Sequence, residues 1–321
     1  RRIVVRGSLT QVTVFGGRLS SASGSIACPA VEIGGPGPAV LEVLAGVSAP
    51  SFPLGTFTAE SARIGTDLGS GRFEGLNGFA RVEVDDAVLV GGESSGTLRQ
   101  FIELSCTRLV VGLASAAVAE QIGRLDVTDA TIVGDGAFGE LELRTFDLGD
   151  LVLGLRPTGT GVVRDPGVAD GPRRVRGDLA IGDLGVGLLE LTRSTHVDGD
   201  VRLGVSAALD GDPGILDRGD GTLWLAGAAT TLHVGGDLLV GVLGNASLVL
   251  RDGARAVIDG SIGFLEVPPT LGPVERRVRI ELGPPAPETP VLAAGGGLAL
   301  PGLEIALAEG VVPHVGQAWR L

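Results

Sequence analysis

The stretch Gly235–Leu250, GGDLLVGVLGNASLVL, holds two short runs of alternating apolar residues that are separated by a glycine corner. Related pieces occur elsewhere: GDLGVGLLEL at Gly182–Leu191, GDGAFGELEL at Gly134–Leu143 and GGPGPAVLEV at Gly34–Val43. Each joins an apolar residue and a glycine to a few small residues and then to an apolar–x–apolar run. The chain is therefore expected to consist of repeats of one short unit.

The period follows from the glycines that come directly after an aliphatic or aromatic residue at the end of a run. These marker glycines are Gly16, Gly34, Gly65, Gly91, Gly112, Gly134, Gly154, Gly182, Gly204, Gly241, Gly263 and Gly283. A step of about 22 residues recurs between them, which is typical of solenoids, where each unit buries its apolar face by stacking on its neighbours. Near the C-terminal end two alignments stay open, because matching Gly236 with Gly260 fits the Gly–Asp corner better than the marker at Gly263.

The local pattern selects among solenoids. The runs are short, have a period of two and are bounded by glycines, which supply the positive φ of tight turns. A leucine-rich repeat needs a helix or its equivalent in each unit and an Asn corner, but Asn occurs only at Asn77 and Asn245. The best helical candidate, Leu113–Ile122, lies where the repeat expects a corner and a strand. The sequence predicts an all-β fold, a single-stranded right-handed parallel β-helix of about twelve coils of roughly 20–22 residues.

The whole chain, residues 1–321, is predicted to form one continuous solenoid, because a solenoid grows along one axis without a second core. Loop insertions are expected at residues 45–57, 155–176 and 205–221, and a Pro-rich break at residues 283–290 precedes terminal coils at residues 291–321. The second and third insertions each follow a marker glycine. We therefore expect them to leave from the same side, about 10 Å apart, and long loops on a rigid scaffold often carry function.

Charge and composition exclude several partners. The formal net charge of −13 argues against nucleic acid or an anionic membrane surface as the main partner. The longest apolar stretch, Leu109–Ala119, is too short to span a membrane. The chain opens at Arg1 with a strand-like run and without a signal peptide, so we expect a processed or truncated form.

The two cysteines test the register. Cys28 and Cys106 each lie six residues before a marker glycine, Gly34 and Gly112. Equal offsets place them at the same corner, three coils or about 14 Å apart, whereas a disulfide needs Cα atoms within about 7 Å. The sequence predicts two free thiols packed as small apolar residues.

The same offset argument predicts ladders of equivalent residues on successive coils. His196 and His233 should lie on adjacent coils, about 5 Å apart, as a stacked surface pair rather than a metal site. The apolar residues at alternating positions should form the core, with outward residues such as Arg202 between them. These predicted core residues are Leu179, Ile181, Val201, Leu203, Leu238 and Val240.

One insertion is rich in carboxylates. Asp210, Asp212, Asp217 and Asp220 lie within it, and calcium prefers several carboxylate or carbonyl oxygens on a flexible loop. Their spacing matches neither an EF-hand nor a nonapeptide calcium repeat, and Asp is also an ordinary turn residue. A turn-forming loop is the main expectation and a calcium-binding loop the alternative, with no other cofactor expected.

No catalytic residue is predicted. Asp85 and Asp86, together with the arginines of the second insertion, suggest acid–base chemistry on a polysaccharide. Adjacent residues in a strand point to opposite faces, however, so the two aspartates should not act as a pair. The arginines in question are Arg156, Arg164, Arg173 and Arg174. A nucleophilic Gly-x-Ser-x-Gly motif is absent as well.

The segment Gly235–Ala254, GGDLLVGVLGNASLVLRDGA, resembles the repeats of bacterial surface and secreted parallel β-helix proteins of the autotransporter-passenger type. The closing segment Leu303–Leu321 is similar to the end of such repeat arrays. The resemblance covers most of the chain, although the chain shows neither a translocator barrel nor Asn ladders. It implies a secreted or cell-surface location in a bacterium and a structural or adhesive role as a rigid rod or fibre.

The expected partners are further copies of the chain, associated end to end or laterally, or material of the cell surface or extracellular matrix. The alternative is a carbohydrate-active enzyme or a glycan-binding β-helix that uses the face under the loops at residues 155–176 and 205–221. The scarcity of aromatic residues weighs against it, because Trp224 and Trp319 are the only tryptophans and tyrosine is absent.

Overall fold

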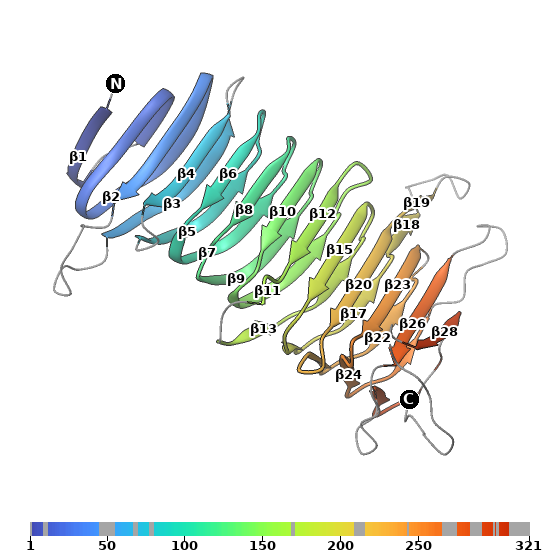
Figure 1. Ribbon diagram of the computed structural model, residues 1–321. Helices are drawn as coiled ribbons and strands as arrows, with labels where there is room; N and C mark the ends of the chain where they lie inside the picture. The colour runs from blue at the N-terminus through green and yellow to red at the C-terminus, as the bar shows by residue number, and fades with distance from the viewer. Residues whose placement is uncertain are drawn as a thin grey trace.

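Strands stacked along one axis make up the computed structural model of the chain (Figure 1). The structure describes residues 2–8, 12–44, 55–66, 70–76, 80–167, 171–208, 216–242, 244–264, 275–282, 291–297, 299 and 302–307. These residues contain strands and turns and no helix. The order of the coils along the axis follows the order of the sequence (Figure 1).

Two parallel sheets run the length of the molecule, and successive strands alternate between them. The first sheet contains β1 (Arg2–Ser8), part of the long bent β2 (Val12–Leu44), β3 (Gly55–Thr66), β5 (Ala80–Val90), β7 (Phe101–Val111), β9 (Arg124–Val133) and β11 (Thr145–Leu153). The second sheet contains the end of β2, then β4 (Gly71–Leu76), β6 (Gly96–Arg99), β8 (Ala117–Glu120), β10 (Phe138–Glu142), β12 (Thr160–Arg164), β15 (Val186–Leu191), β20 (Asp220–Ala226), β23 (Asn245–Arg251), β26 (Arg276–Leu282) and β28 (Leu303–Leu307).

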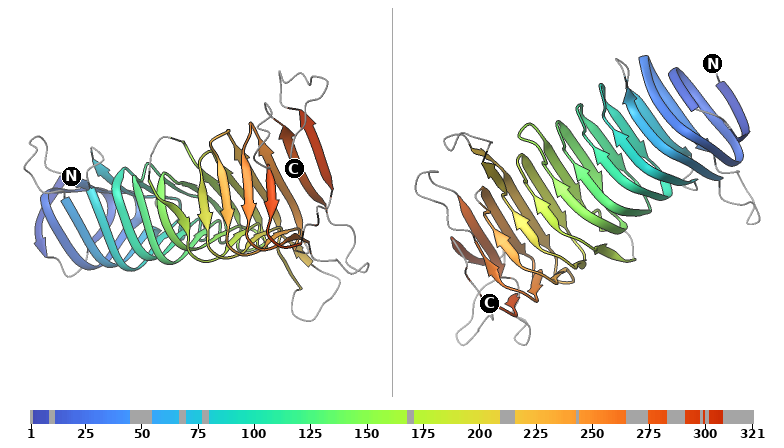
Figure 2. Two further views of the ribbon diagram at one scale, coloured as in Figure 1. Left: turned by 90° about the horizontal axis from the view of Figure 1, so that it is seen from below. Right: turned by 180° about the vertical axis from the view of Figure 1, so that it is seen from behind.

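Beyond β11 the first sheet divides into two arms, because β11 pairs with both β13 and β14. One arm contains β13 (Arg173–Val175), β16 (Thr195–Val197), β21 (Thr231–Val234), β24 (Arg255–Ile258) and β27 (Leu292–Ala294). The other contains β14 (Leu179–Ile181), β17 (Val201–Leu203), β22 (Leu238–Val240) and β25 (Ile262–Gly263). An antiparallel hairpin of β18 (Ser206–Ala208) and β19 (Leu216–Arg218) lies outside the two sheets (Figure 2).

The predicted all-β solenoid is confirmed, with about 11–13 coils. The segment that offered the best helical pattern forms the strand β8 instead, and Gln121 after it has a positive φ of 56°. Good helix formers such as Ala and Glu adopt a strand here because β8 is paired on both sides, with β6 and β10. Tertiary pairing therefore overrides local propensity.

The marker glycines lie where the first sheet turns toward the second. Eight of them, from Gly65 to Gly241, have φ between 62° and 81°, a region that residues with a Cβ adopt at a cost. The marker at Gly263 is wrong, because Gly263 pairs with Leu239 rather than lying opposite Gly241. The alignment of Gly236 with Gly260 is the correct one, since the Gly260 N–H donates to the Gly236 carbonyl.

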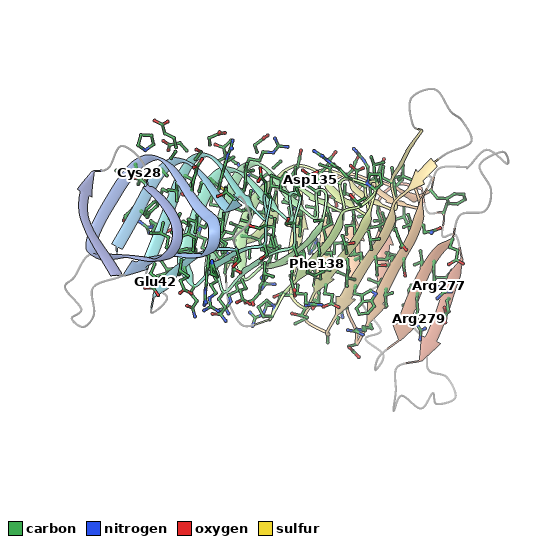
Figure 3. All side chains as sticks on the ribbon, turned by 90° about the horizontal axis from the view of Figure 1, so that it is seen from above. Cys28, Glu42, Asp135, Phe138, Arg277 and Arg279 are labelled. Carbon is green, nitrogen blue, oxygen red and sulfur yellow. The ribbon has the colours of Figure 1, made fainter. Side chains whose placement is uncertain are left out.

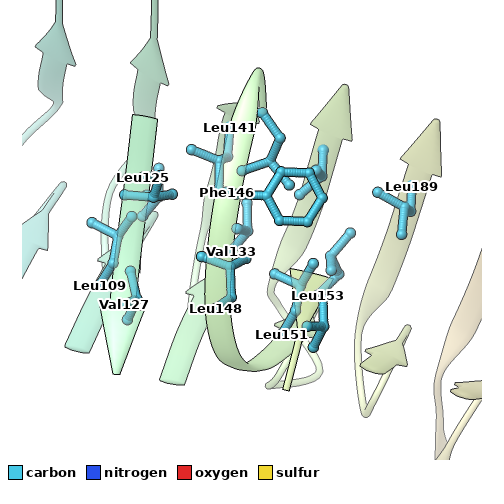
Figure 4. Packing of buried hydrophobic residues seen from close by; sticks show 14 of the residues in the cluster. Leu109, Leu125, Val127, Val133, Leu141, Phe146, Leu148, Leu151, Leu153 and Leu189 are labelled. Atoms are coloured by element: carbon cyan, nitrogen blue, oxygen red, sulfur yellow. The ribbon is translucent and has the colours of Figure 1, made fainter. Parts of the chain in front are cut away.

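The core is a set of ladders, each made of equivalent inward-facing residues on successive coils (Figure 4). The six predicted core residues of β14, β17 and β22 are all buried to 1% exposure or less. In the first coils, phenylalanines from different ladders meet across the core, and the ring of Phe73 packs edge-on against Phe57 and Phe101 at centroid distances of 5.3 and 5.1 Å. Stacking apolar residues on successive coils buries apolar area worth about 25 cal/mol per Å².

Each long strand of the first sheet bends in its middle, and the bend is formed by a β-bulge. We call this bend the corner of the first sheet. The register shifts between Val84 and Ala87 in β5, between Cys106 and Arg108 in β7 and between Leu148 and Asp150 in β11. A bulge leaves residues unpaired and bends the strand. Asp85 and Asp86 fall at such a bulge and are both exposed, so the expectation that they point to opposite faces is wrong.

From β13 onward a Gly–Asp corner replaces the bulge. Asp150 Oδ1 accepts the N–H of Asp178, Asp178 Oδ1 that of Asp200, and Asp200 Oδ1 that of Asp237, each at 2.9 Å. The ladder ends as Asp237 Oδ1 accepts the N–H of Ser261 at 2.7 Å and Ser261 Oγ that of Gly297 at 3.0 Å. Each aspartate thus satisfies a backbone donor of the following coil.

Glycine precedes each aspartate of this corner for a steric reason. A Cβ on Gly199 would lie 2.3 Å from Asp178 Oδ1, and one on Gly236 would lie 2.2 Å from Asp200 Oδ1. The carboxylate of one coil therefore occupies the space that a side chain of the next would need. We call the series Asp150, Asp178, Asp200, Asp237 and Ser261 the Gly–Asp ladder.

The predictions for the two cysteines are confirmed. Cys28 pairs with Ala59, Ala59 with Val84 and Val84 with Cys106, which places the cysteines at the same position three coils apart. Both are free and buried. Burial raises the pKa of the Cys28 thiol to about 11 and, with the charge of Asp126, that of Cys106 to about 12, so both stay protonated at neutral pH.

The two insertions do not leave from the same side. Residues 165–172 connect β12 of the second sheet to β13 of the first, whereas residues 204–219 connect β17 of the first sheet to β20 of the second. The corner after Gly154 is a short turn, and the extra residues come only after Arg164. The insertions therefore lie at opposite ends of the second-sheet strands, two coils apart.

Candidate functional site

The outward side of β8, β10, β12, β15 and β20 lies between these two insertions, and we call it the second-sheet face. Alternation within each strand puts every second residue on this face. The outward residues are Phe138, Glu140 and Glu142 on β10, Thr160, Val162 and Arg164 on β12, and Val186, Leu188 and Glu190 on β15, and they form a grid in register. One edge of the grid consists of Phe138, Thr160 and Val186 and carries no charge, and the other edge is charged.

The charged edge is a column of acidic and basic side chains. Arg99 pairs with Glu120, Glu142 with Arg164 and Arg164 with Glu190 across successive coils. Arg164 forms ion pairs with Glu140 and, at 3.5 Å, with Glu190. Glu142 is bound by Arg144 at 2.7 Å and Glu120 by Arg99 at 3.7 Å. The column offers hydrogen-bond donors and acceptors side by side at the surface.

A hollow of about 300 Å³ opens beside this column. Val118, Ala119 and Leu141 line it together with the charged residues, and Asp165 and Pro166 of the insertion line it as well. The charged residues are Glu120, Glu140, Glu142, Arg164 and Glu190. Its volume is at the lower end for small-molecule sites.

The wall formed by the insertion is held by a buried ion pair. The guanidinium of Arg173 binds the carboxylate of Asp165 through both oxygens, and the two side chains are 2% and 0% exposed. The N–H groups of Gly167 and Thr192 donate to the same carboxylate at 2.8 and 3.2 Å. Burial alone would raise the pKa of Asp165, but these hydrogen bonds and the charge of Arg173 hold it below its usual range.

Two aromatic residues lie on this face, Phe138 on β10 and Trp224 on β20. Phe138, labelled in Figure 3, is 41% exposed, whereas most phenylalanines of the described chain are buried in the core. Trp224 continues the charged column, because it pairs with Glu190, and the guanidinium of Arg251 lies 5.0 Å from its ring centre. An aromatic ring that reaches the surface next to charged side chains is a combination common at recognition surfaces.

A second hollow, of about 460 Å³, lies at the corner between the sheets nearer the N-terminus. Leu89, Leu113 and Ala114 line it together with Glu32, Arg63 and Glu93. The large exposed apolar side chains of the described residues are Ile102, Phe138, Val186, Leu303 and Ile305, and none of them lines this hollow. The second-sheet face therefore offers the richer recognition chemistry.

The predicted carboxylate loop is only partly described. Asp210 and Asp212 lie outside the described residues, and Asp217 pairs with Ala207 in the hairpin. Asp220 begins β20, where loss of surrounding solvent and then the charge of Glu275 raise its pKa. The described residues include no group of three or more His, Cys, Asp or Glu side chains placed to hold a metal ion. Calcium binding by the loop remains a prediction.

The predicted histidine pair is confirmed as adjacent, since His196 pairs directly with His233 and the ring centres are 6.1 Å apart. Asp198 lies 3.1 Å from His196 Nε2 and also binds Arg174. Of the four arginines of the second insertion, Arg156 binds Asp135, Arg164 belongs to the charged column and Arg173 is buried. They therefore do not converge on Asp85 and Asp86.

The charged column is not among the features predicted from the sequence, although its signal is present there. Glu142, Arg164, Glu190 and Trp224 each follow the small inward residue of their strand by three positions, as in Gly139 to Glu142. Aligning the coils at that position, rather than at the marker glycines, would have placed all four on one outward column.

The comparisons with known proteins leave the family open. No family model matches the chain. Searches of curated proteins and of solved structures find no match either. None of the residues that the structure describes belongs to a helix that could span a membrane. The parallel β-helix is thus established by the strand pairing alone.

Proposed function

We propose that the chain is a structural module, a rigid extracellular rod at the surface of a bacterium that can associate with further copies. The observation that carries the proposal is the continuous register of the described strands, which passes from β1 to β28 without a break in the pairing. About twelve coils at about 4.8 Å give a rod on the order of 60 Å long.

The stiffness of such a rod has a physical source in two kinds of ladder. Inward side chains stack without polar interruption over most of the core, and the Gly–Asp ladder ties the backbone of each coil to the one before it. A solenoid transmits load through every neighbouring interface. This geometry gives a surface protein two properties, which are length and a repeating lateral surface.

The edge at β28, the last strand that the structure describes, supports association with further copies. Leu303 and Ile305 of β28 continue the inward ladder of Val278 and Ile280, which are fully buried, yet they are 39% and 48% exposed. Among the described residues β28 pairs only with β26. An unpaired edge with apolar residues is a template for another strand.

Small-angle scattering and electron microscopy over a concentration series test the proposal. Discrete rods near 60 Å at low concentration, growing into longer rods as the concentration rises, are expected. The variant Ile305→Glu should abolish growth, whereas Ile102→Glu, on the side of the rod, should leave it unchanged. A compact or flexible particle at every concentration would refute the rod, and equal growth of both variants would refute association through β28.

A further inference from the structure

The second-sheet face combines three features that coincide nowhere else on the described surface: an exposed phenylalanine, a hollow, and a column of paired acids and bases. Phe138 and Glu140 lie on the same face of β10 with one residue between them, roughly 7 Å apart along the strand. The ring of Phe138 is therefore next to the side chains that line the hollow.

We propose that this face binds an uncharged oligosaccharide, with one sugar ring stacked on Phe138 and the hydroxyl groups of its neighbours bound by the column around Arg164. The inference rests on the glycan-binding alternative raised by the sequence and is independent of the structural role. It concerns binding only, because each glutamate of the hollow is engaged by an arginine.

The chemistry of the grid matches the two-sided character of a sugar. A pyranose ring presents C–H groups on its faces, which pack on an aromatic ring, and hydroxyls at its rim. The carboxylates of Glu120, Glu140 and Glu142 accept hydrogen bonds from hydroxyls, and Arg164 donates them. Val162 and Leu188 lie between the two edges of the grid and provide an apolar floor for the C–H surfaces.

The charges of the side chains around the hollow favour an uncharged ligand. The four glutamates of the hollow are offset by Arg99, Arg144 and Arg164, which leaves a single excess negative charge in the network. The whole chain carries a net charge of −13. A uronate polymer is therefore repelled, and a polycation gains little from a network whose charges are already paired.

The position of the insertion explains why the hollow lies at this coil. Asp165 and Pro166 form its wall, and the buried pair with Arg173 fixes that wall in place. Since β12 is the strand from which the insertion leaves, Arg164 is the rung of the column closest to it. A ligand on Phe138 thus reaches a walled site on the neighbouring coil, about 4.8 Å further along the axis.

Trp224 provides a reporter on the same face. With Trp319→Phe as background, Trp224 is the sole tryptophan of the chain. Its fluorescence is followed while the full-length protein is titrated with linear hexasaccharides of glucose, mannose, xylose and N-acetylglucosamine. Calorimetry gives the affinity, and hexagalacturonate and spermidine serve as the anionic and cationic probes.

We expect at least one uncharged hexasaccharide to bind with a dissociation constant of roughly 1 mM or lower. Phe138→Ala should weaken that binding about tenfold, the loss that about 1.4 kcal/mol of ring stacking represents. Arg164→Gln should weaken it as well. Ile102→Ala, which removes an equally exposed apolar side chain from the first sheet, should leave it unchanged.

Three results would overturn the proposal: no binding by any uncharged hexasaccharide, an unchanged affinity in Phe138→Ala, or equal binding of hexagalacturonate or spermidine. Circular dichroism of each variant shows that a loss of binding is not a loss of fold. Scattering on the same samples reports the rod, so failure of the glycan site and failure of the structural role are distinguished.

Discussion

The two halves of the first sheet turn the same corner by different means. Up to β11 the corner is a bulge inside one long strand, and from β13 it is a Gly–Asp pair between two short strands. The bulges accept different sequences, such as Asp85-Asp86 in β5 and Thr128-Asp129 in β9. The other corner repeats Gly–Asp at Asp178, Asp200 and Asp237. A corner formed by backbone alone tolerates variation, whereas one completed by a neighbour's side chain dictates its residues.

Leu203→Asp should have the largest effect, because it buries a charge in a core ladder that both halves share. Leu203 is 0% exposed, and an unpaired carboxylate in apolar surroundings costs several kcal/mol. Hydrogen exchange should show the coils of β17 and β22 opened. Val133→Asp in β9 should be equally severe, so a mild effect in only one half would mean that the two cores differ.

The control for this change is Arg202→Ala on the outward side of β17. The sequence alone predicts a nearly neutral change there. The structure sharpens this expectation, since Arg202 Nη2 lies 2.7 Å from Asp178 Oδ2 and 3.3 Å from Asp200 Oδ2. A loss of about 1 kcal/mol or less is expected, and a loss equal to that of Leu203→Asp would contradict the inward and outward assignment.

Asp165→Asn tests the junction between the halves, where Arg173 replaces the Phe146 of the preceding coil in the inward ladder. The variant leaves the guanidinium buried without its counter-charge, which costs about 3–5 kcal/mol. Asp198→Asn removes the partner of the exposed Arg174 and should change the melting temperature little. Similar melting temperatures for both variants would show that the buried Asp165–Arg173 pair does not stabilise the fold more than the exposed pair does.

The same pair predicts a pH dependence. Because the pKa of Asp165 is lowered by folding, its contribution is present above the unfolded value of about 4 and is lost as the pH falls through the lower folded value. Wild-type stability should therefore fall more steeply below about pH 4 than that of Asp165→Asn, as measured by denaturant titration.

Asp200→Ala compares the two kinds of corner directly. It removes the acceptor of the Asp237 N–H, a loss of about 1–2 kcal/mol. Asp85→Ala at the bulge of β5 removes an exposed side chain and should stay within about 0.5 kcal/mol. If the bulge variant proves the more harmful, the assignment of side-chain dependence to the Gly–Asp corner is mistaken.

Thr131→Val should have a small effect of the opposite sign. Thr131 interrupts the apolar ladder between Leu109 and Leu151, is 0% exposed, and its hydroxyl has no hydrogen-bond partner among the described residues. Removing it should stabilise the fold by about 1 kcal/mol. Thr195→Val removes a hydroxyl that donates to the Arg193 carbonyl, so thermal unfolding should show no comparable gain.

The fold could be predicted from the sequence because the period of the repeat is visible in the residues themselves. Marker glycines, the two cysteines and the two histidines all fixed the same register, and the pairing of Cys106 with Val84 and of His196 with His233 follows from it. The insertion after Arg164 was misplaced because the glycine corner marks only one end of each second-sheet strand. Nothing in the period states at which end extra residues enter.

The candidate site was harder to predict, because outward residues are not constrained by packing. Glu142, Arg164 and Glu190 share a column only once the strand pairing is known. Arg173 is harder still, since an arginine in an inward ladder contradicts the apolar pattern and is explained only by Asp165. The loop carboxylates, by contrast, are predicted only from the number of aspartates in one insertion. No equivalent position on another coil supports that prediction.

The Gly–Asp ladder also has a direction. Every carboxylate belongs to the earlier coil and every N–H that it accepts to the later one, from Asp150 to Ser261. A chain that emerges from its N-terminus during synthesis thus completes each acceptor before the matching donor arrives. The coils can then fold one after another from the N-terminal side, with each finished coil acting as the template for the next.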